Sequence, residues 1–269
     1  MNLFPKCTLI ASTYNWPSAL ELLLLSVLRQ SHLPDEVIIA DDGSNEDTVL
    51  LIQKFQKKFP VPLLHVWQED NGFQKATILN KAIAQSKYEY IIQIDGDIIM
   101  HQHFIKDHLT YALDNHYLFG SRSNIQEKAL NRVLTHKIID FSPFSKGIKK
   151  RTRTIRFPFL MNFIKTTSKR SKKLRGCNVS FWKKDFIAIN GYNEKFNGWG
   201  MEDSELIERF HNAGIKGRRL KNVAIAYHIY HKELKKDRVT INQSIEDETA
   251  LKKIKFTEKG IDQYLQVKL

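Results

Sequence analysis

Two aspartates separated by one glycine, Asp95 and Asp97, directly follow the apolar run Tyr90–Ile94. Two carboxylates at this spacing can share one hard divalent cation, or divide a cation and a hydroxyl between them, and the glycine lets a ligand approach the backbone closely. Asp-Gly is also common turn chemistry, but a position at the end of a buried strand favours the ligand site. His228, which ends the apolar run Val223–Tyr227, offers a third ligand for the cation.

A second acidic pair, Asp41 and Asp42, follows the apolar run Val37–Ala40. An acidic residue at such a strand end can accept hydrogen bonds from a nucleotide base or ribose. An Asx turn with a helix cap would account for Asp42 without any ligand. We therefore assign Asp41 to ligand contact and regard Asp42 as partly structural.

Further along the chain, Trp199 stands between two glycines and is followed by Glu202 and Asp203. The dipole of a helix that starts here explains one acid, but it does not explain the tryptophan. A flat indole on a glycine-flanked loop offers a stacking face for a sugar, and a neighbouring carboxylate can take a proton from a hydroxyl. We interpret this stretch as a binding site for a sugar acceptor.

The acidic motifs and the histidine can form one site only if strands and helices place them at the same edge of one sheet. In the first half, β-rich runs alternate with stretches of helical spacing, which predicts βαβ units and an α/β fold whose mostly parallel central sheet is flanked by helices. The expected strands are Thr8–Ser12, Glu36–Ala40, Leu63–Trp67 and Tyr90–Ile94, and the helices are Pro17–Gln30, Glu46–Phe59 and Phe73–Gln85. Later strands are expected at Leu118–Ser121, Asn178–Trp182 and Val223–Tyr227, helices at Glu127–Ile139, Lys184–Ile189 and Met201–Ala213, and a short helical tail from Ser244. Ligands of such sheets bind at the carboxyl ends of the strands, where the acidic motifs lie.

The 269-residue chain is 42% hydrophobic, and its formal net charge of +13 is concentrated in one segment. The 44 residues between Asp140 and Asp185 carry 14 Lys or Arg and no acid, whereas the rest carries 28 basic and 29 acidic residues. Basic blocks within 146–175 flank the stretch Phe157–Ile164, a composition typical of a segment that lies on an anionic membrane surface. A lid over the ligand site is the alternative. No zinc spacing or recognition-helix signature supports nucleic-acid binding.

The apolar runs, the start of the chain and the cysteines indicate in which cellular compartment the protein is expected. No apolar run reaches the ~20 residues of a membrane-spanning helix, and the start of the chain has no export signal. Cys7 and Cys177 are too few for a disulfide framework, so we interpret them as free buried thiols in a reducing compartment. Together with the basic segment, this predicts a cytoplasmic protein, peripheral on the inner face of the cell membrane.

The order of the motifs resembles that of the family 2 nucleotide-sugar glycosyltransferases of GT-A (Rossmann-like) fold. The motifs are Ile10–Asn15, Ile39–Ser44, Asp70–Phe73, Asp95–Asp97 as the DxD motif, and Gly198–Asp203. The last motif also looks like the acceptor-side motif of β-1,4-galactosyltransferases and of bacterial chondroitin-type polymerases. The similarity covers roughly residues 6–232, and the insert 141–175 is unmatched.

The resemblance implies roles for individual residues. On the donor side, the nucleotide would contact Thr13, Asn15, Asp41 and Asp95, with Lys75 in place of the arginines that the family often carries near Gln74 and at Leu79. Mn²⁺ or Mg²⁺ would be held by Asp97, His228 and Asp95, with His231 or Lys232 near the diphosphate. On the acceptor side, Trp199, Gly200 and Glu202 would bind the acceptor, and Asp203 would be the general base, with Glu202 beside it as the second catalytic acid.

The implied function is metal-dependent, inverting transfer of a hexosyl or N-acetylhexosaminyl group from a UDP-sugar. The acceptor would be a hydroxyl of a glycan or lipid-linked molecule in cell-surface polysaccharide or lipopolysaccharide biosynthesis. The alternative is a non-catalytic nucleotide-binding module that tethers partners at an anionic membrane surface. We expect a nucleotide-sugar-binding half at 1–125, a basic, partly helical insert at 126–176, an acceptor-binding and catalytic half at 177–235, and a tail at 236–269.

Overall fold

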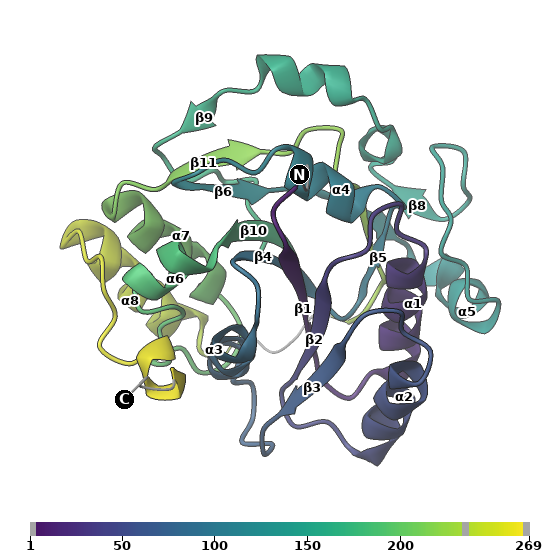
Figure 1. Cartoon of the computed structure of the whole chain (residues 1–269), viewed down its shortest axis with the longest axis horizontal. Coiled ribbons are helices and arrows are strands. Elements are labelled where there is room, and N and C mark those ends of the chain that lie inside the picture. Colours follow the sequence, from purple (N-terminus) through teal and green to yellow (C-terminus); the bar gives the residue numbers. More distant parts are fainter. Residues whose placement is uncertain (1–3, 233–236, 266–269) are drawn as a thin grey trace.

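The computed structural model describes residues 4–232 and 237–265. Its central sheet has eight strands in the order β3-β2-β1-β4-β10-β6-β11-β9 (Figure 1). Strands β1 (Cys7–Thr13), β2 (Glu36–Asp41), β3 (Leu63–Trp67) and β4 (Tyr90–Asp95) run parallel. Strand β10 (Asn178–Trp182) is antiparallel to both β4 and β6 (His116–Phe119); β11 (Lys216–Arg219) then runs parallel to β6, and β9 (Thr166–Thr167) closes the edge. The predicted α/β fold with a largely parallel sheet is confirmed.

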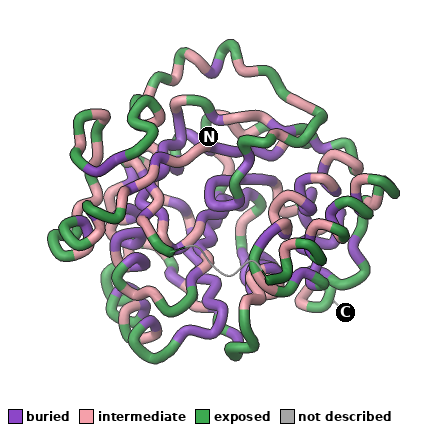
Figure 2. The backbone as a smooth tube through the Cα atoms, turned by 180° about the vertical axis from the view of Figure 1, so that it is seen from behind, coloured by how far each residue is buried: buried purple, intermediate pink, exposed green. Residues whose placement is uncertain are grey.

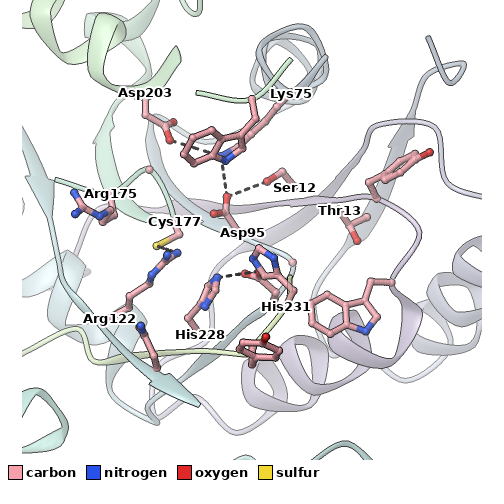
Figure 3. Close-up of a pocket in the computed structure, with 18 of the residues that line it drawn as sticks. Ser12, Thr13, Lys75, Asp95, Arg122, Arg175, Cys177, Asp203, His228 and His231 are labelled. Atoms are coloured by element: carbon pink, nitrogen blue, oxygen red, sulfur yellow. Dashed lines mark hydrogen bonds and ion pairs between the residues drawn. The ribbon is translucent and has the colours of Figure 1, made fainter. Parts of the chain in front are cut away.

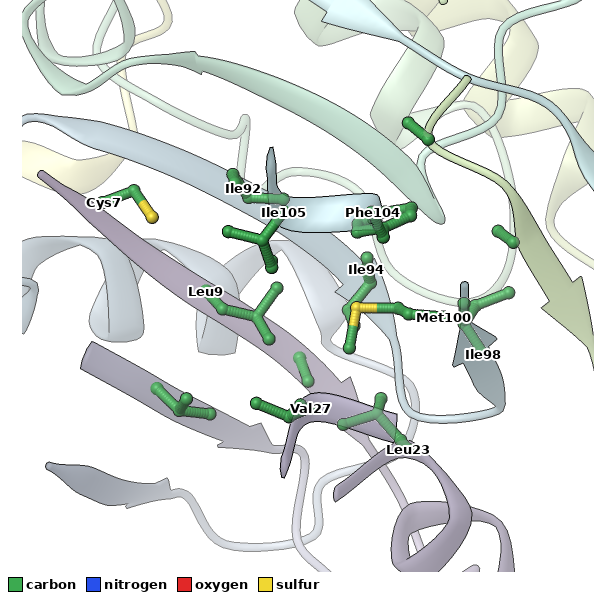
Figure 4. Close-up of a cluster of buried hydrophobic side chains, with 14 of the residues drawn as sticks. Cys7, Leu9, Leu23, Val27, Ile92, Ile94, Ile98, Met100, Phe104 and Ile105 are labelled. Atoms are coloured by element: carbon green, nitrogen blue, oxygen red, sulfur yellow. The ribbon is translucent and has the colours of Figure 1, made fainter. Parts of the chain in front are cut away.

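Helices cover both faces of this sheet because successive residues of each strand point to opposite sides. On one face, Leu9 packs in a cluster with α1 (Pro17–Leu28), α2 (Glu46–Gln56) and α4 (Phe104–Thr110), as Figure 4 shows for Leu23, Val27 and Phe104. On the other face, Ile10 packs with α3 (Lys75–Gln85), α6 (Lys183–Ala188) and α7 (Glu202–Asn212). Both faces are therefore buried.

A second, smaller sheet lies beside the end of β4, and only one of its strands was predicted. Its order is β5 (Ile98–Met100), β12 (Ala226–His228), β7 (Arg122–Ile125) and β8 (Ile148–Lys149). His228 pairs with Ile98 and Asn124, so the strand after the DxD turn lies directly beside the predicted histidine. A cluster formed with α1 and α5 (Glu127–Thr135) buries its apolar face.

The basic segment forms an outer arch between β8 and β9, above β11 and α4 in Figure 1. It contains two short 3₁₀ helices, η1 (Arg151–Thr154) and η2 (Pro158–Phe163). Arg156 fixes the arch to the body: its Nε and Nη2 lie 3.1 and 2.5 Å from the two carboxylate oxygens of Asp107 on α4. Figure 2 shows that much of the arch is exposed or intermediate. In residues 4–232 and 237–265, no helix is both long enough and apolar enough to cross a membrane.

The last elements that the structure describes pack against the body. Helix α8 (Val239–Leu251) begins five residues before the predicted tail helix and lies on α7, where Thr249 Oγ1 donates to Glu205 Oε1 at 3.1 Å. The short 3₁₀ helix η3 (Ile261–Tyr264) contacts α3, and Ile261 is fully buried there. The C-terminal residues that the structure describes thus stabilise the helix that starts with Glu202 and Asp203.

Candidate active site

A cavity of about 1020 Å³ opens at the carboxyl ends of β1 and β4 (Figure 3). Most of the predicted site residues lie on its wall: Thr13, Lys75, Asp95, Asp97, Trp199, Gly200, Glu202, Asp203, His228 and His231. Three predicted residues, Asn15, Asp41 and Lys232, do not line it. The topology explains the convergence, because β1, β4 and the DxD turn meet the end of β12 and the start of α7 at this edge.

The two aspartates after β2 occupy different positions from those we expected. Asp41 is fully buried; its Oδ1 accepts from the Ser44 N–H at 2.8 Å, and its Oδ2 lies 2.8 Å from His65 Nε2. Asp42 lies on the cavity wall, where it accepts from Gln68 Nε2 at 2.6 Å and from a backbone N–H at 2.8 Å. Burial raises the pKa of Asp42 to about 6. Asp42 therefore has structural partners, but they are not those of the Asx turn and helix cap that we expected, because the bond to the Ser44 N–H belongs to Asp41. The place of Asp42 on the wall was not predicted.

Asn15 supports the loop after β2. Its backbone N–H donates to Ser44 Oγ at 2.8 Å, and its Oδ1 accepts from the Asn45 N–H at 2.8 Å. The loops that follow β1 and β2 are therefore linked by hydrogen bonds. Ser12, Thr13 and Tyr14, rather than Asn15, line the cavity at the end of β1.

Asp97, His228 and His231 form a cluster that could hold a metal ion. One ligand atom from each lies within 4.8 Å of the others, and Asp97 Oδ2 lies 3.2 Å from His228 Nε2 and 3.3 Å from His231 Nε2. Burial raises the pKa of Asp97, but the hydrogen bonds from the two histidines outweigh it and hold this pKa below its usual range. Asp97 Oδ1 is buried and has no hydrogen-bond partner among the described residues. A carboxylate with a vacant buried oxygen beside two imidazoles fits a divalent cation.

This cluster differs from the predicted ligand set in one member. His231, which we expected near the diphosphate, lies in the cluster, whereas Asp95 does not. Asp95 Oδ1 instead accepts from Ser12 Oγ at 3.2 Å and lies 2.9 Å from Lys75 Nζ. Lys232 is exposed, and its carbonyl lies 2.8 Å from His231 Nδ1.

Lys75 joins the carboxylates of the two sides of the cavity. Its Nζ lies 3.7 Å from Glu202 Oε1 and 3.7 Å from Asp203 Oδ2, in addition to its contact with Asp95. Burial lowers the pKa of this ammonium, but the three negative charges outweigh it and raise the pKa well above the ordinary value. The positive charge that we expected to contact the nucleotide is therefore shared among three carboxylates.

Tyr192 positions Asp203: its hydroxyl donates a hydrogen bond to Asp203 Oδ1 at 3.0 Å. The same hydroxyl accepts a hydrogen bond from Gln93 Nε2 at 2.8 Å. Gly176 lies against the other side, where a Cβ atom would come within 1.7 Å of Asp203 Oδ2. Only glycine leaves room for this carboxylate. The side chain of Asp203 is 22% exposed, against 9% for Glu202.

Glu202 has a different environment. Burial, together with the nearby charge of Asp203, raises its pKa to about 7, although Lys75 acts in the opposite direction. It therefore exchanges its proton near neutral pH and can donate as well as accept a hydrogen bond.

The loop before α7 has an unusual backbone that carries the aromatic wall residue. Gly198, Gly200 and Met201 all have positive φ, at 74°, 108° and 73°, and two glycines make this conformation inexpensive. Asn242 on α8 donates to the Gly200 carbonyl at 3.0 Å and fixes the loop from behind. Trp199 is 42% exposed and lines the cavity.

Sequence reasoning missed several wall residues. Arg122 begins β7, and its Nη1 lies 3.5 Å from Cys177 Sγ (Figure 3). Both cysteines are free and buried, as predicted, and burial raises the pKa of Cys177 to about 12. The only signal for Arg122 was its position just after the predicted strand Leu118–Ser121, where a strand end meets the ligand edge.

Two family models match the chain. Residues 8–174 match glycosyl transferase family 2, and residues 162–232 match the N-terminal domain of galactosyltransferase. The hyaluronan synthase of Pasteurella multocida is 27% identical over 237 residues, and the chondroitin synthase of P. multocida strain Pm70 is 26% identical over 240 residues. Each match covers 82% of this chain but 24% of the relative, so the chain spans about a quarter of the length of these relatives.

Solved structures share the fold. Staphylococcus aureus TarS 1-349 in complex with UDP-GlcNAc has a TM-score of 0.65 at 17% identity, and the match covers 97% of this chain and 70% of that one. The mannosyltransferase PcManGT of Pyrobaculum calidifontis, in complex with GDP-Man and Mn²⁺, has a TM-score of 0.64 at 15% identity, covering 99% of this chain and 71% of that one. These neighbours confirm the predicted GT-A fold.

Proposed function

Because the chain belongs to glycosyl transferase family 2, we propose that it transfers a hexosyl or N-acetylhexosaminyl group from a UDP-sugar to a hydroxyl of a glycan or lipid-linked acceptor. The observation that carries this proposal is one cavity in which the cation cluster at Asp97 lies opposite Asp203. The related hyaluronan and chondroitin synthases and the UDP-GlcNAc complex of TarS support a UDP-sugar donor. The pathway would be the assembly of cell-surface polysaccharide or lipopolysaccharide.

The donor diphosphate would lie at the DxD turn. Asp97, His228 and His231 would hold Mn²⁺ or Mg²⁺, which supplies positive charge to a diphosphate leaving group. The Mn²⁺ complex of PcManGT supports this assignment. Thr13 and Asp42 on the wall would contact the nucleoside, with Asp41 and Asn15 holding the loops that carry them. Asp95 would accept from the ribose.

The acceptor would lie between Trp199 and the start of α7. Trp199 offers its face to the sugar ring, and Glu202 hydrogen-bonds the acceptor hydroxyls. Asp203 takes the proton of the attacking hydroxyl, because it is the more exposed of the two acids and is positioned by Tyr192. The hydroxyl oxygen forms a bond to the anomeric carbon while the bond to the UDP oxygen breaks and UDP leaves with its electron pair. This single displacement inverts the configuration of the anomeric centre.

Release of UDP tests the proposal. With Mn²⁺ and UDP-linked Gal, Glc, GlcNAc or GalNAc, we expect slow hydrolysis of at least one donor, and faster UDP release when a glycan acceptor is added. Asp97→Asn should lose this activity. Binding of UDP-sugars without any hydrolysis or transfer would instead favour the non-catalytic nucleotide-binding module.

The outer arch supports a membrane-surface location for the enzyme. Phe157, Phe159 and Phe163 are 49%, 59% and 67% exposed, and their successive ring centroids lie 6.1 and 5.5 Å apart. We call these three residues the aromatic crown. Exposed cations flank it in the sequence, namely Arg151 and Lys165 on the arch and Lys169, Lys172 and Lys173 after β9. An exposed aromatic cluster within basic residues fits an anionic bilayer, where each cation contributes about 1 kcal/mol.

Vesicle flotation tests the surface. With vesicles containing phosphatidylglycerol, we expect the protein to float with the lipid, and the triple variant Phe157→Ser/Phe159→Ser/Phe163→Ser to stay in solution. The matched control Leu251→Ser/Phe256→Ser removes two exposed apolar side chains elsewhere, 83% and 56% exposed, and should still float. Equal flotation of both variants would contradict the membrane role of the crown and leave the arch as a lid.

A further inference from the structure

The positive charge of the basic segment is divided between two places. One part surrounds the aromatic crown on the outer arch. The other part, Lys149 of β8 and Arg175 of the loop before β10, lies on the cavity wall together with Arg122, which belongs to β7 and precedes the segment. We call these three residues the cationic rim. Figure 3 shows Arg122 and Arg175 in the close-up of this cavity, next to Cys177.

The rim lies between the cation cluster and the predicted base. Lys149 of β8 pairs with Asn124 of β7, and Asn124 pairs with His228 of β12. Lys149 therefore lies two strands away from a histidine of the cation cluster. At the other end of the rim, Arg175 precedes Gly176, which packs against the Asp203 carboxylate. A group bound by the rim would therefore lie beside the bond that Asp203 helps to form.

None of the rim cations forms a close ion pair with an acidic residue that the structure describes, although, against the lowering effect of burial, the charges of Asp97 and Asp95 help to raise the pKa of Arg122. The carboxylates of the site are occupied by other groups: Asp97 by two histidines, and Asp95, Glu202 and Asp203 by Lys75. Arg122 Nη1 has a thiol at 3.5 Å, a weak acceptor, and Arg175 Nη1 donates to backbone carbonyls. Glu127 also lines the wall, but in the part of the chain that the structure describes it forms no ion pair with the rim.

Two further cations crowd the same place. Lys150 follows Lys149, and Arg153 Nη1 donates to the Arg122 carbonyl at 3.0 Å. Burial lowers the pKa of Lys150, and the charges of Arg153, Arg122, Arg175 and Lys149 lower it further. These like charges repel one another, and an anion bound among them would relieve the repulsion.

The donor alone does not account for this charge. The cation cluster already offers a divalent ion for the two negative charges of a diphosphate ester. Three cations on the adjoining wall, with two more behind them, exceed what the donor needs. Charge complementarity therefore indicates a second anion in the cavity.

We propose that Arg122, Lys149 and Arg175 bind an anionic group, a phosphate or carboxylate, that is carried by the acceptor sugar. This inference rests on the proposed function, since it names the acceptor class of the same site. The enzyme would then prefer a negatively charged glycan over a neutral one, and the rim would determine that preference.

Ligand-observed NMR on the whole protein tests the inference, with glucose 6-phosphate, methyl glucuronide and methyl glucoside as probes. Each is titrated with and without UDP and Mn²⁺. We expect at least tenfold tighter binding of the two anionic sugars than of the neutral one. In Lys149→Gln/Arg175→Gln the difference should fall below threefold, while the Kd for UDP with Mn²⁺ stays within twofold. Both residues are exposed, so the variant should fold.

A matched variant removes the same charge elsewhere. Lys57→Gln/Lys58→Gln changes two exposed lysines after α2, outside the cavity wall, and should keep the preference. Equal binding of all three sugars by the unmodified protein would overturn the inference. So would a tenfold loss of UDP affinity in the rim variant with the sugar preference intact, because the rim would then serve the donor.

Vesicle flotation of the rim variant distinguishes an anion carried by a sugar from the headgroup of a lipid. If the rim variant kept the preference for anionic sugars but no longer floated with phosphatidylglycerol vesicles, the rim would bind lipid and the inference would be wrong. Failure of the proposed function looks different: with Mn²⁺ no UDP-sugar would be hydrolysed or transferred, whatever the sugar titrations showed.

Discussion

At the scale of single residues, Asp203 and Glu202 are adjacent in the chain but differ in surroundings. Asp203 faces the cavity between Tyr192 and Gly176, whereas Glu202 is nearly buried against Lys75. Asp203→Asn keeps the size of the side chain and an acceptor oxygen for Tyr192 but removes the proposed base. We expect kcat for transfer to fall by about 10²- to 10⁴-fold with the Kd for UDP unchanged. Glu208→Gln, on the same helix outside the cavity wall, should retain wild-type turnover; if Asp203→Asn does too, another group is the base.

Glu202 gives the protein a pH-dependent stability. Its pKa is raised by burial from 4.5 to about 7, so the folded protein holds this proton more tightly than the unfolded chain. The resulting stabilisation is complete below about pH 4.5 and is lost as pH rises through about 7. Glu202→Gln stays neutral and should therefore become more stable than the wild type above pH 7, by on the order of 3 kcal/mol.

Urea unfolding at pH 5 and pH 8 measures this difference. The gain from Glu202→Gln should grow between the two pH values, and a gain that is the same at both would mean that Glu202 titrates as an ordinary surface acid. Transfer activity should be measured in parallel, since the same substitution removes an acceptor contact.

The sequence predicted which residues lie in the site better than it predicted which residues each of them contacts. Asp95, Asp97, Asp203 and His228 could be located because strand ends and a helix start converge in this type of sheet. The exchange of Asp95 for His231 in the cation cluster could not be predicted, because it depends on the backbone path after β12. Similarly, the choice between Asp41 and Asp42 depends on which side of the strand end faces His65.

At the scale of elements, the pair Arg156–Asp107 holds the arch against α4. Asp107 is 1% exposed and accepts from Arg156 and from the Ala224 N–H at 2.9 Å. Arg156→Met would leave a buried carboxylate with one remaining backbone donor, so we expect a loss of about 2 kcal/mol in the free energy of unfolding. Faster proteolysis within 151–163 should accompany it.

The control is an exposed ion pair. Lys184 and Asp114 lie 3.4 Å apart with side chains 56% and 75% exposed, so Lys184→Met should change the free energy of unfolding by less than about 0.5 kcal/mol. Equal effects of the two substitutions would show that Arg156 contributes no more than an ordinary surface charge.

Elements with strong periodicity were predicted well. Strands β3 and β10 agree with the predicted bounds residue for residue, and the other strands and helices predicted before residue 122 begin and end within three residues of the observed bounds. Helix α4 was not predicted. The short strands β5, β7, β8, β9 and β11 were missed. Strand β11 has the sequence Lys-Gly-Arg-Arg, which has no strand pattern, and it is extended because β6 and β9 hydrogen-bond to it. Tertiary pairing outweighs local propensity in such segments.

At the scale of the whole molecule, the net charge of +13 is an average over unlike parts. The body is close to neutral, and its acids include the carboxylate of the candidate cation cluster and the three around Lys75, one of which is the proposed base Asp203. The basic residues divide between an outer arch and the cationic rim. The net charge of the whole chain therefore describes neither surface, and the charge of each surface has to be considered separately.

The proposed halves of the chain share one sheet. Strand β10, from the range 177–235, lies between β4 and β6, both from the range 1–125. We expect one cooperative unfolding transition in calorimetry, with the van't Hoff enthalpy equal to the calorimetric enthalpy. Two resolved transitions would indicate that the ranges unfold independently.

The same strand order has a consequence for synthesis on the ribosome. When residues 1–125 have emerged, β4 and β6 have no strand between them, and each presents an unpaired edge until residues 178–182 follow. Native hydrogen bonding in the middle of the sheet therefore waits for more than fifty further residues to be translated, including the whole basic segment. During that interval the nascent chain exposes an apolar strand that aggregates easily, and a chaperone that shields it would raise the yield of folded protein.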